Sequence, residues 1–92
     1  MIQQQISLVT SIIDDLATVE HLTCNEDKTQ LLELIKEILK DCKQAKHSSK
    51  ADITIQAMHD LANVNSSDIN KQLLELVNLS EKALTELYKQ QK

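Results

Sequence analysis

The sequence predicts an all-α fold, a single antiparallel up-down-up-down four-helix bundle. Three observations predict it. The 92 residues contain no Gly and no Pro, aliphatic residues supply most of the apolar fraction, and four segments repeat them at helical spacing. Without Gly or Pro, β-hairpins lose their favoured turn residues. The length suits one small domain, so we expect a single domain over 1–92 with helices near 2–21, 26–46, 50–63 and 67–90.

The first two helices are predicted from apolar residues that recur every three or four positions. In the first helix they are Ile2, Ile6, Val9, Ile13 and Leu16. In the second helix they are Leu31, Ile35, Ile38, Cys42 and Ala45. Thr23 and Glu26 lie three residues apart between the helices, the spacing of a capping box, and a start at Asn25 is the alternative.

The last two helices follow the same rule. The third is shorter, with the apolar stripe Ile53, Ala57, Met58, Leu61 and Val64. The fourth has Ile69, Leu73, Leu76, Ser80, Ala83 and Leu87 along its seam. Because the chain has no Gly, we expect Asn63 or Asn65 to end the third helix in a left-handed conformation.

The composition excludes several classes of function. Without Gly there is no P-loop and no dinucleotide-binding turn, and without Arg there is no bidentate phosphate clamp. The chain has one aromatic residue and an acidic first helix, which argues against nucleic-acid binding. Pairs such as Cys24 with His21 and Cys42 with His47 lie at opposite ends of the predicted hairpin, so we expect no metal and no cofactor. No nucleophile and base converge, and we expect no enzyme.

A lysine-rich face is the first candidate for partner binding. Lys36, Lys40, Lys43 and His47 fall on one side of the second helix. Such a row suits an acidic partner or an anionic membrane surface, and a solvated face is the alternative.

The fourth helix is the second candidate. Leu74 and Leu79 extend its apolar surface beyond what one seam needs, and Tyr88 lies beside them. Surplus apolar surface of this kind indicates a partner groove or a dimer, and deeper burial inside the bundle is the alternative.

His59 is predicted to be exposed, since it lies off the stripe of the third helix. The segment His59-Asp60-Leu61-Ala62-Asn63 resembles the His-x-Leu-Lys-Gly pattern of histidine phosphotransfer domains, at the histidine and the leucine. Ala62 replaces the lysine and Asn63 replaces the glycine of that pattern. A degenerate phosphotransfer domain, with His59 as its nucleophile, is therefore one alternative function.

The layout also resembles that of the pediocin-like bacteriocin immunity proteins, which are small antiparallel four-helix bundles. The matching stretches are Leu8–Asp15 and Asn25–Leu32, followed by the lysine-rich second helix, the shorter third helix and Ile69–Tyr88. The resemblance implies protection against a pore-forming peptide through recognition of a bacteriocin–receptor complex at the membrane. It carries no individual functional residue over to this chain.

The hypothesis that follows is a small, non-enzymatic bacterial protein of the cytoplasm that binds another protein at or near the inner membrane. A helical chaperone or inhibitor of phage or secretion origin, which pairs through its broad first or fourth helix, is a further alternative, and a dimer is left open. The N-terminus has neither the basic nor the apolar region of a signal peptide.

Overall fold

The computed structural model describes residues 2–45, 49–64 and 67–90, with the side chains of residues 2, 20 and 49 left undescribed. The elements in chain order are α1 (Ile2–Leu16), the 3₁₀ helix η1 (Ala17–His21), α2 (Asn25–Gln44), α3 (Ser49–Ala62) and α4 (Ile69–Gln90). No strand occurs in these three ranges, and the four α-helices pack against one another. The prediction of an all-α fold of four packed helices is confirmed.

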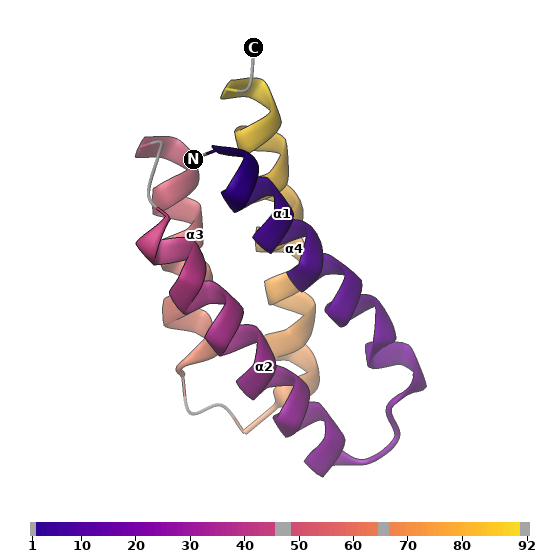
Figure 1. Ribbon diagram of the computed structural model, residues 1–92. Helices are drawn as coiled ribbons and strands as arrows, with labels where there is room; N and C mark the ends of the chain where they lie inside the picture. Colours follow the sequence, from indigo (N-terminus) through magenta and orange to yellow (C-terminus); the bar gives the residue numbers. More distant parts are fainter. Residues whose placement is uncertain (1, 46–48, 65–66, 91–92) are drawn as a thin grey trace.

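The helices form a four-cornered arrangement. α1 packs against α2 and α4, α3 packs against the same two helices, and α2 also approaches α4. The molecule is elongated, with extents of 41 × 22 × 18 Å. α1 begins and α4 ends toward one end of the molecule, and η1 lies toward the other (Figure 1).

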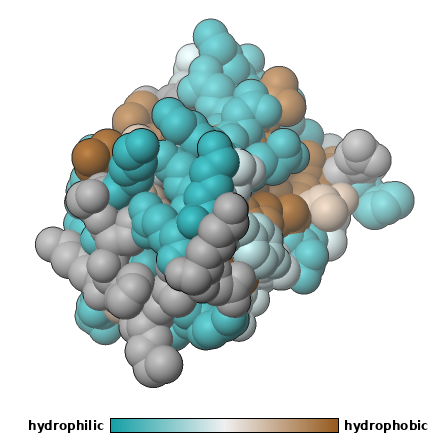
Figure 2. All heavy atoms as spheres, turned by 90° about the horizontal axis from the view of Figure 1, so that it is seen from above, coloured by the Kyte–Doolittle hydropathy of each residue, from teal (hydrophilic) through white to brown (hydrophobic). Residues whose placement is uncertain are grey.

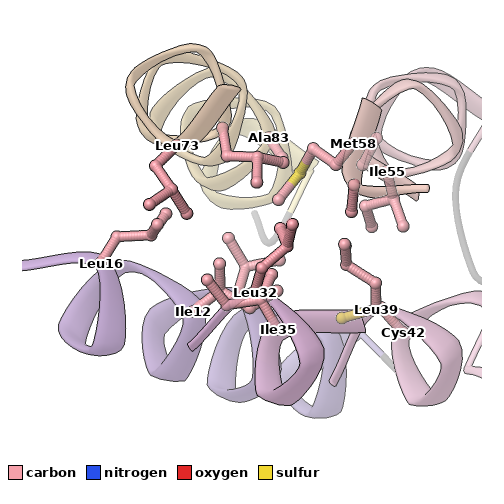
Figure 3. Close-up of a cluster of buried hydrophobic side chains, with 14 of the residues drawn as sticks. Ile12, Leu16, Leu32, Ile35, Leu39, Cys42, Ile55, Met58, Leu73 and Ala83 are labelled. Carbon is pink, nitrogen blue, oxygen red and sulfur yellow. The ribbon is translucent and has the colours of Figure 1, made fainter. Parts of the chain in front are cut away.

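The core is built almost entirely from aliphatic side chains. Figure 3 shows Ile12, Ile35, Met58 and Leu73 converging from α1, α2, α3 and α4 respectively. Burying each side chain of this size stabilises the fold by about 1.5–3 kcal/mol. The buried stripe of α4 contains Leu73, Leu76, Ser80, Ala83 and Leu87, as the sequence predicts.

The first predicted helix is not continuous. α1 ends at Leu16, and residues 17–21 form η1 instead of a further α-helical turn. The Thr18 hydroxyl donates to the Asp15 carbonyl oxygen at 2.7 Å, and the Leu22 N–H donates to the Val19 carbonyl oxygen at 3.0 Å. Both hydrogen bonds join residues three apart, as in a 3₁₀ helix, and they tighten the chain as it leaves α1. Such a turn is common at helix ends. Helical spacing alone gave no sign of the change, because Val19 continues the apolar stripe.

The starts of α2 and α4 use acidic side chains. The predicted capping box is wrong, because the N-cap of α2 is Cys24 and it makes no side-chain capping bond. Glu26 and Asp27 lie in the first turn of α2, where they interact favourably with the positive end of the helix dipole. At the start of α4, a carboxylate oxygen of Asp68 accepts the backbone N–H of Lys71 at 3.2 Å, which is N-capping geometry.

The end of α3 is closed by side-chain amides. Asn63 donates its Nδ2 to the His59 carbonyl oxygen at 2.8 Å. Gln72, on α4 and only 4% exposed, donates its Nε2 to the carbonyl oxygens of Leu61 at 2.8 Å and Val64 at 3.1 Å. No described residue has a positive φ, so the predicted left-handed cap is wrong for Asn63. The other predicted cap, residue 65, lies outside the described residues.

A second buried glutamine closes the end of α2. Gln5 lies on α1 and is 0% exposed. Its Nε2 donates to the Cys42 carbonyl oxygen at 3.4 Å and to a carboxylate oxygen of Asp52, near the start of α3, at 3.0 Å. One side chain of α1 thereby joins the last turn of α2 to the first turns of α3. Its own Oε1 has no hydrogen-bond partner.

Most of the predicted buried stripe of α3 is in the wrong register, although Met58 is buried as predicted. Ile53 is 71% exposed and Val64 is 52% exposed, whereas the buried stripe consists of Ala51, Ile55, Met58 and Ala62. This stripe has equally good helical spacing, but alanines at its two ends made it look weaker in the sequence. Thr54 also turns inward, where its hydroxyl donates to a carboxylate oxygen of Glu86 at 2.5 Å.

The register of α3 predicts opposite effects for two neighbouring isoleucines. Ile55→Ala removes a fully buried side chain and should lower the free energy of unfolding by about 2–5 kcal/mol. Ile53→Ala removes an exposed side chain and should change it by less than about 0.5 kcal/mol. Urea unfolding followed by circular dichroism measures both. Equal losses, or a larger loss for Ile53→Ala, would show that the helix packs in the register that the sequence suggested.

Candidate functional site

The exposed apolar residues of α4 do not behave alike. Leu74 is 62% exposed and Tyr88 is 52% exposed, but Leu79 is half-buried and packs against the core. Leu74 and Tyr88 are therefore surface residues, and Leu79 serves mainly to pack the bundle.

An apolar groove runs beside Leu74, between α1 with η1 on one side and α4 on the other. Its volume is about 470 Å³. Its walls are formed by Ile13, Leu16, Ala17, Val19, Asn70, Leu73, Leu74, Val77 and Glu81. Seen from above, at the end where α1 begins and α4 ends in Figure 1, the surface is mostly hydrophilic, with smaller hydrophobic areas at its edges, one of them on the side where η1 lies (Figure 2).

The local structure explains why the groove exists. Ala17, the first residue of η1, is small and exposed, so it leaves space where a larger residue would fill the angle between α1 and α4. Leu16 and Leu73 form the buried floor, at 4% and 1% exposed, and Leu74 forms the outer wall of α4. The groove is thus continuous with the core.

The charges beside the groove differ at its two ends. Glu81 is the only ionisable residue in its walls. Asn70 lies eleven residues earlier on α4, about 16 Å away along the helix axis. The carboxamide oxygen of Asn70 accepts a hydrogen bond from Lys28 Nζ at 2.8 Å. The groove therefore has an anion near one end and a cation near the other.

The predicted lysine face is only partly free. Lys36 pairs with Glu33 at 2.9 Å, and its side chain is 27% exposed. Lys40 is exposed and Lys43 is half-buried, while residue 47, the histidine predicted to continue the row, lies outside the described residues. Lys36 also lines a second pocket of about 440 Å³ between α2 and the α3–α4 turn, together with Asn25, Thr29, Leu32, Glu33, Asn63, Val64, Ile69 and Gln72. Polar side chains form much of that pocket.

His59 is half-buried rather than exposed. Its side chain is 31% exposed, and its Nδ1 is buried without a hydrogen-bond partner, 3.8 Å from a carboxylate oxygen of Asp60. The expectation of an exposed ring followed from the wrong register of α3. Ala62, where phosphotransfer domains carry lysine, is fully buried in the core.

The two cysteines are in opposite environments. Cys24 is exposed and Cys42 is fully buried, and both are free thiols. Burial, and secondarily the negative charge of Asp41, raises the pKa of the Cys42 thiol from its ordinary 9.0 to about 12. Within the described ranges, no group of three or more His, Cys, Asp or Glu residues is placed to hold a metal ion.

Sequence reasoning found surplus apolar surface on both walls of the groove but did not bring the two walls together. Leu74 was singled out for its surplus apolar surface. Ile13 was assigned to the core seam of the first helix, and Ala17 was not considered. The broad apolar stripe on the first helix was the sequence feature that indicated this wall. The stripe lines a groove only because α1 ends at Leu16.

No family model, no curated protein and no solved structure matches this chain. None of the helices in the described part of the chain is both long enough and apolar enough to cross a membrane.

The burial of Cys42 predicts selective thiol chemistry. In the folded protein near pH 8, a thiol reagent such as iodoacetamide should modify Cys24 and leave Cys42 unmodified, because only the thiolate reacts and burial disfavours it. Mass spectrometry should therefore count one modified thiol in buffer and two in denaturant. Two thiols modified at equal rates in buffer would contradict the buried position.

The raised pKa of Cys42 also predicts a pH dependence of stability. The folded chain keeps a thiol proton that the unfolded chain releases above about pH 9, so the free energy of unfolding falls as the pH rises from there toward about 12.

Proposed function

We propose that this protein is a small, non-enzymatic bundle that binds another protein, and that its binding surface is the groove between α1, η1 and α4. The observation that carries the proposal is the apolar wall beside an exposed leucine, Leu74, in a groove of about 470 Å³.

The chemistry of the groove suits a helical partner. Contiguous exposed apolar surface is costly in water and commonly marks an interaction site. Amphipathic helices bind in such grooves through apolar residues spaced three or four apart. The walls contain no aromatic residue and no arginine, so affinity would come from aliphatic packing along Leu74 and Val77.

The most concrete form of this function is that of a bacteriocin immunity-type protein. The resemblance of helix lengths and hydrophobic spacing supports it, together with the exposed groove. In this form the protein acts from the cytoplasm and recognises a bacteriocin–receptor complex at the inner membrane surface. Lys40, exposed on α2, is then a candidate contact for anionic lipid or for an acidic partner.

We also propose that consecutive helices run antiparallel, in up-down-up-down order. Gln5, near the start of α1, bonds to Cys42, near the end of α2, which supports opposite directions for these two helices. Thr54, near the start of α3, bonds to Glu86, near the end of α4. Gln72, near the start of α4, donates to Leu61 in the last turn of α3 and to Val64 just after it.

Expression in a Gram-positive strain sensitive to pediocin-like peptides tests the function. We expect the strain to survive peptide concentrations that kill the same strain carrying an empty vector. Leu74→Ser should remove this protection because it makes the groove wall polar. Leu34→Ser is the matched control, since Leu34 is 50% exposed on α2 and does not line the groove.

Two results would contradict the proposal. Sensitivity to a panel of such peptides equal to that of the empty-vector strain would exclude the immunity function. Equal loss of protection from Leu74→Ser and Leu34→Ser, with both variants folded by circular dichroism, would exclude the groove as its site.

A further inference from the structure

The solvent side of α3 carries an apolar face that no other part of the described chain covers. Ile53 and Ala57 are both exposed and lie on one side of the helix, opposite the buried stripe that contains Ile55 and Met58. Ile53 is the most exposed large apolar side chain described, at 71%. We call Ile53 and Ala57, together with the exposed Lys50 and Asp60 on the same side, the outer face of α3.

We propose that the outer face of α3 in one molecule docks into the groove of a second copy of the same chain. The proposal rests on the groove and on α3, and it does not depend on the function proposed above. It has a consequence for that function, however, because a second copy and a partner protein would compete for one surface.

The two surfaces match in length and in polarity. Lys50 and Asp60 are ten residues apart on α3, a span of about 15 Å along the helix axis. Asn70 and Glu81 at the two ends of the groove are eleven residues apart on α4, about 16 Å. The outer face therefore has nearly the same length as the groove, with its apolar residues between two charged ends.

The charges match in only one orientation. Lys50 is exposed one turn before Ile53, and Asp60 is exposed near the other end of the outer face. If the docked α3 runs antiparallel to α4, Lys50 approaches Glu81, and Asp60 approaches Lys28 at the Asn70 end. The reverse orientation places like charges together, which is unfavourable.

The direction of the helix dipole favours the same orientation. The positive N-terminal end of the docked α3 then lies toward Glu81, and its negative C-terminal end lies toward Lys28. Complementary charges of this kind fix register and orientation more than they add affinity.

The contact joins two different surfaces, so it is heterologous. Each docked molecule leaves one groove and one outer face free, and further copies can add to form short chains or a closed ring. A single helix face of three turns is small for a protein interface, so we expect weak and reversible association.

Sedimentation of the full chain over rising concentration tests the association. We expect the average mass to rise with concentration up to ~1 mM, the range of weak complexes, and to fall again on dilution. Wild-type protein that remains a monomer over the whole range would overturn the proposal. That result would leave the survival test of the proposed function unaffected.

Mixing two variants tests the pairing of surfaces. Ile53→Glu disables the outer face and leaves the groove intact, whereas Leu74→Glu disables the groove and leaves the outer face intact. Each variant alone should be a monomer, and an equimolar mixture should form a one-to-one dimer that does not grow further. Leu34→Glu, on neither surface, should associate like wild type. All three positions are at least half exposed, so the variants should keep the wild-type helical signal.

Charge exchange tests the orientation. Glu81→Lys should weaken association by about two- to fivefold, the range expected for an exposed ion pair. Adding Lys50→Glu in the same chain should restore it, because the pair is reformed with its signs reversed. Glu37→Lys is the matched control, since Glu37 is exposed on α2 and away from both surfaces. The docking mode would be overturned if the mixture of Ile53→Glu and Leu74→Glu failed to dimerise. It would also be overturned if the double variant Glu81→Lys/Lys50→Glu associated more weakly than Glu81→Lys alone.

Discussion

The bundle depends on two buried glutamines. Each donates its side-chain amide to backbone carbonyl oxygens at the C-terminal end of a neighbouring helix. A helix leaves four carbonyl groups unpaired at its C-terminus, and glycine in a left-handed turn is the usual way to close it. This chain has no glycine. Gln5 reaches from α1 to the last turn of α2, and Gln72 reaches from α4 to the end of α3. A buried carbonyl left unpaired costs about 1–3 kcal/mol, so these bonds couple the ends of α2 and α3 to the packing of α1 and α4.

The same constraint bears on the binding surface. With helix ends fixed by side chains of the bundle, the connection that leaves α1 is a 3₁₀ helix rather than a glycine turn, and it begins with the small residue Ala17. That transition leaves the groove open beside Leu74, over a floor formed by Leu16 and Leu73. Arginine and tryptophan, which dominate many interfaces, are absent. Recognition at this surface therefore relies on aliphatic shape and on charges near its ends.

The spacing of apolar residues predicted the four helices well, because the chain has no Gly or Pro to interrupt it. It failed to predict the buried side of α3, where two different sets of residues have equally good helical spacing. On α3 the small residue Ala51 is buried and the large residue Ile53 is exposed, a choice that depends on how closely α3 approaches its neighbours. His59 was misplaced by the same error. One wall of the groove was predictable from the surplus apolar surface of Leu74. The other wall was foreseen only as a broad apolar stripe on the first helix, because the end of α1 at Leu16 depends on local hydrogen bonds between residues three apart, which apolar spacing does not reveal.

Hydrogen exchange of the glutamine side-chain amides, followed by nuclear magnetic resonance, tests the central role of Gln5 and Gln72 most directly. Both side chains donate to backbone carbonyl oxygens while almost fully buried, so their Nε2 protons should exchange far more slowly than those of the exposed Gln30. Exchange of all three amides at one common rate would show that the helix ends are not held by these side chains, and would contradict the account.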